Sequence, residues 1–458
     1  MAKKKENKPT RIGNILSVAA GAHKKDVGAG GQVWDPYLSH VRSIRFPSLG
    51  LMAMLGFTGL RDSCTILIDG APGSHKSSLA IEMFNWGVPY GLGGAIIDCE
   101  NKAAVDIAMG TLDETTLWLP GHLTMLSTFS VEDTQDIISD YVKKCAEMNK
   151  GIERNQQVPF MVIVDPIAGT PADETLKQVK KYGHGDKGHG GRAEANIWNS
   201  YIKVHESQII NLPFISVFVN HMKMRQKQNT GPITVMEKYN PGGISQNYAT
   251  TIALRCSSGR AVYSESLTGK SYNEVWIKCE KNSRGPTGVK TCVRKYWRRR
   301  KDGLTSFWWD WGRNTAEYLA SLPANSPARE ICSVVKSTNE KFSCKKLGFK
   351  DASPTEIGDT VMADRAMVSQ IVNVLMLRKL DEFDPISDDD RASLRKIAHE
   401  NHLKYLAEAG IAIDAEENAS DNEDEPTVEE DPLVIAEPTI NLDGDGTDDF
   451  GESADNNF

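Results

Sequence analysis

Short apolar runs recur along the middle of the chain, and each ends in a polar or small residue. Six such runs occupy residues 65–69, 94–99, 123–128, 160–165, 214–220 and 251–256. Helix-length segments lie between several of them, at residues 77–86, 131–148 and 193–210. Strands that are apolar throughout and alternate with helices indicate a parallel sheet covered on both faces. The pattern therefore predicts an α/β core.

A different pattern follows residue 256. Residues 274–281, 289–297 and 304–311 alternate or carry aromatic side chains, and Asp302-Gly303 is a strong turn signal between the last two. We expect antiparallel hairpins here. Residues 313–410 favour helices, one of which is expected to begin with Ser353 as its cap and Pro354 at its first position.

These patterns divide the chain into four parts. We expect a basic arm or polymerisation segment over residues 1–45, the α/β core with its hairpin extension over 46–312, a small helical domain over 313–412, and a disordered acidic tail over 413–458. Eight cysteines are scattered without any C-x-x-C spacing, which favours reduced core thiols over disulfides or metal ligands. No apolar run is long enough to span a membrane, so a soluble, cytoplasmic protein is expected.

Charge is distributed unevenly along the chain. Of the 61 acidic residues, 17 lie beyond residue 410, where lysine and arginine are absent, which leaves 44 acidic against 53 basic residues before it. The body therefore carries about +9 and the tail about −17. A basic body suits a polyanionic partner. The tail either competes for the same surface or only solvates the protein.

The stretch directly behind the first apolar run resembles a phosphate-binding loop. It comprises Gly70, Ala71, Pro72, Gly73, Ser74, His75, Lys76 and Ser77, and Ser78 follows it. In such loops backbone N–H groups and a helix N-terminus face the phosphates, the lysine adds a point charge, and the Ser hydroxyl binds Mg²⁺. His75 stands where the pattern G-x-x-x-x-G-K-[ST] has its second glycine, and Gly73 is a candidate to supply the missing backbone freedom. The alternative is an ordinary strand-turn-helix junction with a solvated lysine.

Carboxylates follow two other runs. Asp165 ends the run at 160–165, as in a Walker B strand whose aspartate orients magnesium. Glu100 follows the run at 94–99, where a carboxylate can act as general base on the water that attacks a terminal phosphate. Apolar strands that end in aspartate are frequent. For Glu100 alone, a charge near a helix start is as common an explanation as a catalytic role. The two residues together are therefore stronger evidence for a nucleotide site than either one alone.

Taken in order, the loop, Glu100, Asp165 and the stretch Asn220-His221-Met222-Lys223 resemble RecA-type DNA recombinases over roughly residues 45–300, most closely those of bacteriophages and bacterial RecA. The resemblance implies a RecA-like P-loop ATPase core that binds ATP and Mg²⁺. It makes residues 70–78 the nucleotide loop, and it makes Lys76, Glu100 and His221 catalytic. Ser77 and Asp165 would bind the metal ion. Pro166 stands where the family usually has a small hydroxylated residue.

The resemblance also implies residues that sense nucleotide and hold DNA. Asn220 and His221 occupy the position that senses the γ-phosphate, and Lys281, with Arg284 in place of a second lysine, would reach ATP in the next subunit. Residues 185–192 resemble the first DNA-binding loop and residues 222–243 the second. Their proposed DNA contacts are His189, Gly190, Gly191, Arg192, Lys223, Arg225, Lys227, Gly242 and Gly243. His184 and His189 lack further metal-ligand spacing and are taken as loop histidines.

The expected function is an ATP-dependent homologous recombinase. It would form helical filaments on single-stranded DNA, pair that strand with homologous duplex DNA, and work with single-strand-binding or mediator proteins in the host cytoplasm. The rival readings are a hexameric RecA-fold helicase or DNA motor, and a regulatory ATP-binding module without a DNA partner. Residues 294–301, with the tryptophans at 308, 309 and 311, are either a secondary DNA site or a solvated hairpin whose tryptophans pack on the core.

Overall fold

The computed structural model describes residues 43–376. It leaves out residues 57–58, 101–110, 112–122, 129, 153–156, 169, 183–189, 227–235, 240–245, 247–248, 264–270, 300–304 and 339. The expected N-terminal arm up to residue 42, the end of the helical domain and the acidic tail therefore lie outside the described residues. Within those that are described, no helix combines the length and the apolar character needed to cross a membrane.

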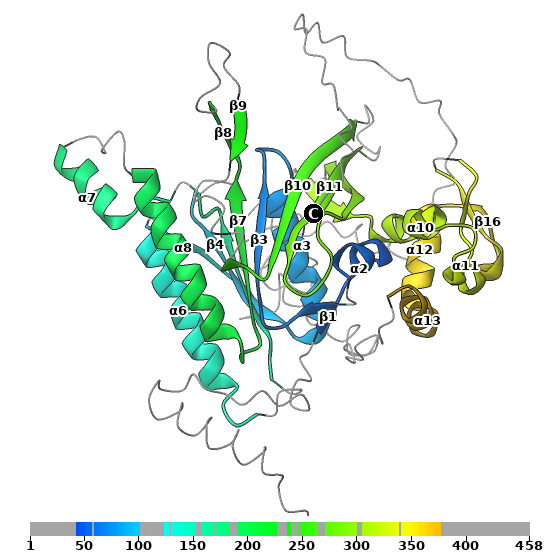
Figure 1. Cartoon of the computed structure of the whole chain (residues 1–458), viewed down its shortest axis with the longest axis horizontal. Helices are drawn as coiled ribbons and strands as arrows, with labels where there is room; N and C mark the ends of the chain where they lie inside the picture. Colours follow the sequence, from blue (N-terminus) through cyan, green and yellow to red (C-terminus); the bar gives the residue numbers. More distant parts are fainter. Residues whose placement is uncertain are drawn as a thin grey trace, which may run out of the picture. The chain divides into compact units, whose positions relative to one another are not determined.

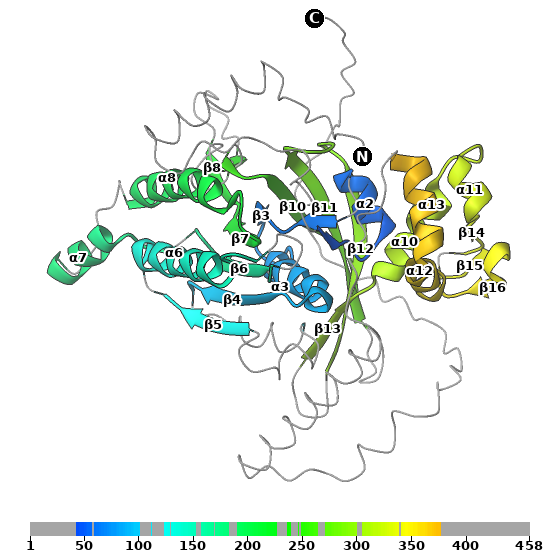
Figure 2. The same ribbon diagram turned by 90° about the horizontal axis from the view of Figure 1, so that it is seen from below.

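A nine-stranded sheet forms the centre of the fold, in the order β13-β12-β11-β10-β3-β7-β6-β4-β5 (Figure 2). Six neighbouring strands of it are parallel. They are β3 (Cys64–Gly70), β4 (Gly93–Asp98), β5 (Leu123–Ser127), β6 (Phe160–Asp165), β7 (Phe214–His221) and β10 (Ile252–Val262). These strands cover the six apolar runs, so the α/β expectation is confirmed. β10 continues past residue 256, where its expected end lay.

The central parallel strands β3, β4, β6 and β7 are buried on both faces, as their apolar composition requires, whereas the edge strand β5 is partly exposed. Alternate residues of one strand enter different cores: Ile66 belongs to one hydrophobic cluster and Leu67 to the other, and Met161 and Val162 divide in the same way. This is the two-residue period of a strand. The main covering helices are α3 (Lys76–Gly87) on one face, and α6 (Val131–Met148) and α8 (Gly190–Ile209) on the other (Figures 1 and 2).

Three antiparallel strands extend the sheet beyond β10. They are β11 (Ser271–Asn282), β12 (Lys290–Arg299) and β13 (Thr305–Trp309), each paired with its predecessor. The predicted hairpins are therefore present, although the Asp302-Gly303 turn lies outside the described residues. We call these three strands the antiparallel extension. Lys295 and Asn273 oppose each other across β12 and β11, a pairing that matters below.

Smaller elements complete the N-terminal and middle parts. They are β1 (Ser43–Arg45), α2 (Leu49–Leu55), β2 (Gly59–Arg61), η1 (Val88–Tyr90), α7 (Asp173–Tyr182), β8 (Lys223–Gln226) and β9 (Met236–Tyr239). β8 and β9 pair with each other inside the segment expected to be a DNA-binding loop. A segment predicted as one long loop thus contains a two-stranded ribbon. The eight cysteines are all free, and six of them are buried.

The C-terminal part is not purely helical, contrary to expectation. Its helices are α10 (Trp311–Ser321), α11 (Pro327–Ile331), η3 (Lys345–Leu347), α12 (Pro354–Ala363) and α13 (Arg365–Met376). Among them lies a sheet of β14 (Val335–Lys336), β15 (Phe342–Cys344) and β16 (Phe349–Ala352). Phe342 and Cys344 are buried while Ser343 is less so, the alternation of a strand. Ser353 and Pro354 start α12 as predicted, but the Ser353 side chain makes no capping hydrogen bond.

Candidate functional site

The candidate phosphate loop connects β3 to α3. Gly73 and His75 both have positive φ angles, 75° and 63°. His75 is the N-cap of α3 and is left-handed, a conformation that glycine adopts without strain and that histidine adopts more readily than most residues. The histidine that breaks the motif therefore takes the backbone conformation suited to the glycine it replaces. The first intrahelical bond runs from Leu79 N to His75 O, 3.0 Å.

The Lys76 side chain folds into this loop. Its Nζ donates to the Ala71 carbonyl at 2.7 Å and lies 3.5 Å from Ser74 Oγ. Ser74 in turn donates its hydroxyl to the same carbonyl at 2.7 Å. Only 4% of Lys76 is exposed, and this burial lowers the pKa of its ammonium group. A partly desolvated ammonium inside a turn of backbone groups gains strongly from an anion that replaces the lost water.

Ser77 and Asp165 lie side by side across the first turn of α3 and the end of β6. The Ser77 side chain donates a hydrogen bond to the Asp165 carboxylate. Burial raises the pKa of Asp165 to about 6, and the carboxylates of Asp98 and Glu100 act in the same direction, while Ser77 and Lys76 oppose it. A buried carboxylate next to a hydroxyl is an oxygen donor pair that suits Mg²⁺. These residues therefore fit the expected metal. The Asp165–Pro166 peptide bond is cis.

Glu100 and His221 meet from different strands. His221 Nε2 lies 3.7 Å from Glu100 Oε1, and the two side chains are 29% and 28% exposed. The chain turns after β4 through two bonds: Glu100 N donates to Asp98 Oδ1 at 3.1 Å, and Cys99 N to the Asp165 carbonyl at 2.9 Å. Glu100 is thus held beside the end of β6. A carboxylate accessible to water and next to an imidazole can orient and deprotonate a water molecule.

Strand β7 joins this pair to the loop. His221 is in register with Gly70, and Met222 N donates to the Gly70 carbonyl at 3.0 Å. The preceding Asn220 is fully buried and donates from Nδ2 to Gln246 Oε1 at 2.9 Å. Residue 246 follows the segment predicted as the second DNA loop. The hydrogen bond between Asn220 and Gln246 therefore connects the end of β7 to the residue just beyond that segment.

A second charged cluster beside the loop has no signal in the sequence. Arg255 on β10 holds the buried Asp69 carboxylate with two hydrogen bonds, of 2.9 and 3.1 Å. Its remaining nitrogen lies 3.0 Å from Glu280 Oε1. Asp69 directly precedes Gly70, so this bidentate pair fixes the end of β3 from which the loop leaves. It could not be predicted because it depends on the parallel pairing of β3 with β10.

The remaining nucleotide-binding candidates have contacts within their own chain. Lys281 Nζ donates to the Thr250 carbonyl, and burial lowers the pKa of that lysine. Arg284 is exposed and its backbone N donates to Asn282 Oδ1. Their contact with ATP in a neighbouring subunit stays a prediction.

The predicted DNA contacts are described only in part. Gly190, Gly191 and Arg192 form the first turn of α8, so the first candidate loop ends in a helix. Lys223 and Arg225 are in β8. His189, Lys227, Gly242 and Gly243 lie outside the described residues, and DNA contact at all of these positions stays a prediction.

The aromatic residues of the antiparallel extension divide between core and surface. Trp309 and Trp311 are 6% and 8% exposed, whereas Trp308 is 37% exposed. Trp311 belongs to α10 and not to the expected strand. Arg294 is paired with Glu340, with Nη2 and Oε1 3.0 Å apart. Packing on the core therefore accounts for Trp309 and Trp311, and the secondary DNA site stays a prediction.

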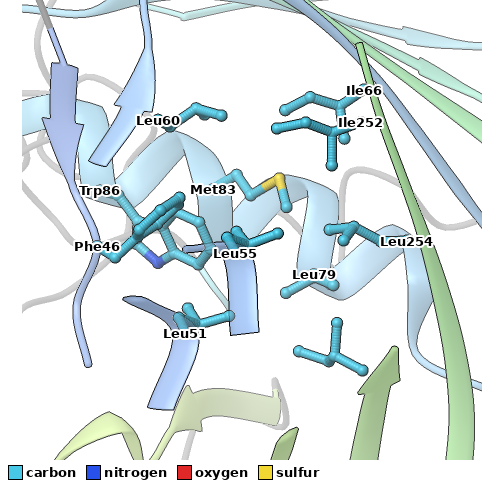
Figure 3. Close-up of a pocket in the computed structure, with 11 residues that line it drawn as sticks. Phe46, Leu51, Leu55, Leu60, Ile66, Leu79, Met83, Trp86, Ile252 and Leu254 are labelled. Atoms are coloured by element: carbon cyan, nitrogen blue, oxygen red, sulfur yellow. The ribbon is translucent and has the colours of Figure 1, made fainter. Parts of the chain in front are cut away.

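One small pocket lies apart from these residues (Figure 3). Its walls are apolar side chains of α2, α3, β10 and neighbouring strands, such as Leu55, Met83 and Leu254. No residue of the candidate site lines it, and its lining belongs to the hydrophobic core. We interpret it as a packing gap. In the described part of the chain, no three His, Cys, Asp or Glu side chains converge as a metal cluster.

The candidate site is therefore built from four strand ends: the loop after β3, Glu100 after β4, Asp165 at the end of β6, and Asn220 and His221 at the end of β7. Neighbouring parallel strands present their carboxyl ends at one edge of the sheet, where ligands bind in such folds. Comparison with known proteins adds no name to this arrangement: no protein-family model matches the sequence, and no curated protein is significantly similar to it.

Proposed function

We propose that this protein is a Mg²⁺-dependent ATPase of the RecA type and acts as a homologous recombinase on single-stranded DNA. The observation that carries the proposal is the meeting of the loop lysine, the Ser77–Asp165 pair and the Glu100–His221 pair at one edge of the sheet. Each has a distinct part in phosphoryl transfer to water, and the three come from four different strand ends.

The chemistry follows from these positions. Backbone N–H groups of the loop and the Lys76 ammonium would bind the phosphates, and Ser77 and Asp165 would hold Mg²⁺, which supplies charge neutralisation when bound. Glu100 would take the proton from the attacking water, a contribution of about 10²–10⁴ in rate for a positioned general base. His221 contacts Glu100. It is therefore placed to report the state of the γ-phosphate to the segment that begins at Met222.

The DNA part of the proposal rests on charge and on the resemblance. The body of the chain carries about +9 once the acidic tail is set aside. The segment after His221 contains Lys223, Arg225 and Lys227. A phosphate sensor followed directly by a basic segment would couple nucleotide state to DNA affinity, which is what a filament that assembles with ATP and releases DNA after hydrolysis needs.

Two variants test the nucleotide site. Lys76→Ala should abolish ATP binding and hydrolysis, because it removes the loop lysine expected to contact the outer phosphates. Glu100→Gln should bind ATP with unchanged affinity and lose turnover. Glu147→Gln, an exposed position on α6, is the matched control and should behave as wild type. Normal hydrolysis by Glu100→Gln would assign the general base to another residue.

Joint-molecule formation tests the recombinase reading against its rivals. With ATP, Mg²⁺ and a homologous duplex, the protein should pair a single strand into a D-loop and form open helical filaments in electron micrographs. Closed rings that separate duplex strands would favour the helicase or motor. ATP turnover without any DNA binding would favour the regulatory module. Either closed rings that separate strands or ATP turnover without DNA binding would overturn the proposal.

A further inference from the structure

Three side chains contact the candidate nucleotide loop and the start of α3, one from β10 and two from the antiparallel extension. Ser258 Oγ on β10 donates to the Gly73 carbonyl at 2.8 Å. Asn273 Nδ2 on β11 lies 3.2 Å from His75 Nε2, and Lys295 Nζ on β12 donates to Ser78 Oγ at 2.7 Å. Asn273 and Lys295 are directly opposed in the sheet, so one cross-strand pair reaches two positions of the loop and helix start.

His75 is the part of the loop that needs such support. Its left-handed backbone, with φ at 63°, is unfavourable for a residue with a Cβ. Its Nε2 lies 3.2 Å from Asn273 Nδ2, and with the ring proton on Nδ1 this nitrogen accepts a hydrogen bond from the Asn273 amide. This contact holds the strained residue in place.

Lys295 supports the next turn. It is 4% exposed, its ammonium lies 4.0 Å from the centroid of the Phe307 ring, and Ser78 Oγ accepts its hydrogen bond. Burial lowers the pKa of this lysine to about 8, and Glu82 opposes the change. A lysine with little access to water is costly unless it is paired. Its position beside the first turn of α3 therefore indicates a role beyond packing.

That first turn is where a polyphosphate would bind. Leu79 N makes the first backbone bond of α3, so the N–H groups of Lys76, Ser77 and Ser78 precede the intrahelical ladder and are oriented as at any helix N-terminus. Ser78 is 4% exposed and its side chain is held by Lys295. Fixing Ser78 fixes the direction of these N–H groups.

We propose that Lys295 and Asn273 are positioning residues for the polyphosphate of a bound nucleotide: Lys295 acts through Ser78 and Asn273 through His75, so that the antiparallel extension holds the loop in its phosphate-accepting form. This inference rests on the proposed nucleotide site. It assigns a role to two residues that lie nearly 200 positions or more beyond the loop and that no phosphate-loop motif includes.

The test is the affinity for a fluorescent ATP analogue, with Mg²⁺, of the full-length protein. Lys295→Met keeps length and apolar volume, and should weaken binding about tenfold, with Asn273→Ala weakening it several-fold. Lys290→Met is the matched control, because Lys290 is an exposed lysine of the same strand that stacks on Trp276. It should bind as wild type. At saturating ATP, the kcat of Lys295→Met should stay within twofold of wild type while KM rises, because Glu100 is untouched.

A double-variant cycle tests whether Lys295 acts through Ser78. Adding Lys295→Met to Ser78→Ala should weaken binding by no more than twofold, because residues in one contact are not additive. Full additivity would show that Lys295 does not act through Ser78.

If wild type binds no nucleotide, both the inference and the proposed function fail. If wild type binds, and folded Lys295→Met and Asn273→Ala bind equally well, only the inference fails. Asn273→Ala decides the question should Lys295→Met not fold.

Discussion

Among single residues, His75 is the strained position of the candidate phosphate loop, because its left-handed backbone stands where the motif has a glycine. The structure gives it the left-handed backbone of a glycine and a hydrogen-bond partner, Asn273, from a distant strand. The partner could not be predicted, because it depends on the register of the antiparallel extension.

Substitution of His75 tests this interpretation. His75→Ala keeps the strained backbone and loses the contact with Asn273, whereas His75→Gly loses the contact but relieves the strain. We therefore expect the Gly variant to be more stable than the Ala variant, by about 1 kcal/mol in the free energy of unfolding. Urea denaturation of both variants measures the difference. An Ala variant as stable as the Gly variant would mean that residue 75 is not strained.

Lys295 gives a pH dependence with a definite sign. Burial lowers its pKa from 10.5 to about 8, so between these values the unfolded chain binds the proton and the folded chain does not. The penalty for burying the ammonium is complete below about pH 8 and fades as the pH rises to 10.5. Lys295→Met should therefore gain stability relative to wild type at pH 7, and this advantage should shrink by about 2 kcal/mol at pH 10. Denaturation of both proteins at the two pH values measures it, and a difference that does not change with pH would contradict the buried ammonium.

At the scale of elements, the sequence predicts what local periodicity controls. The bounds of β6 and α6 agree with the apolar run and the helix-length segment that predicted them, since each has clear polar limits. The small sheet of β14, β15 and β16 was missed, because strands of two to four residues are too short for a two-residue period to be distinguished from a turn. Strand order was also beyond prediction, although it decides which strand ends meet.

A buried glutamate joins α3 to α10, and its loss tests that junction. Glu82 Oε1 accepts hydrogen bonds from the indole nitrogens of Trp311 at 2.8 Å and Trp86 at 3.3 Å. Glu82→Ala would leave both buried N–H groups without this acceptor, at about 1–3 kcal/mol each. We expect a loss of about 2–4 kcal/mol in unfolding free energy, measured by urea denaturation, against no measurable loss for the exposed Glu147→Ala. A loss below 1 kcal/mol would show that the junction does not depend on Glu82.

At the scale of the whole molecule, the meeting of Glu100 with His221 shows what sequence can and cannot supply. The sequence placed both residues at strand ends on the same edge, and that part is confirmed. Their contact depends on β6 lying between β4 and β7, since Glu100 has to reach past the end of β6 to His221. The separation of charge between body and tail, by contrast, can be counted directly from the sequence, although the tail lies outside the described residues.

The charge asymmetry predicts an effect of the tail on DNA binding. Deleting residues 413–458 removes 17 acidic side chains and should strengthen binding to duplex DNA, most at low salt, where screening is weakest. A tail of the same length with Asn and Gln in place of Asp and Glu should have the same effect. Fluorescence anisotropy at several salt concentrations measures it. Equal affinities for all three proteins would leave the tail a solvating segment.

We propose that this chain hydrolyses ATP at the edge formed by β3, β4, β6 and β7 and that DNA controls this activity. The most direct test is the rate of ATP hydrolysis by the purified wild-type protein in Mg²⁺, with and without single-stranded DNA. We predict slow hydrolysis alone and a clear increase with single-stranded DNA, absent in Lys76→Ala. A rate that single-stranded DNA leaves unchanged, or hydrolysis that survives Lys76→Ala, would contradict the account.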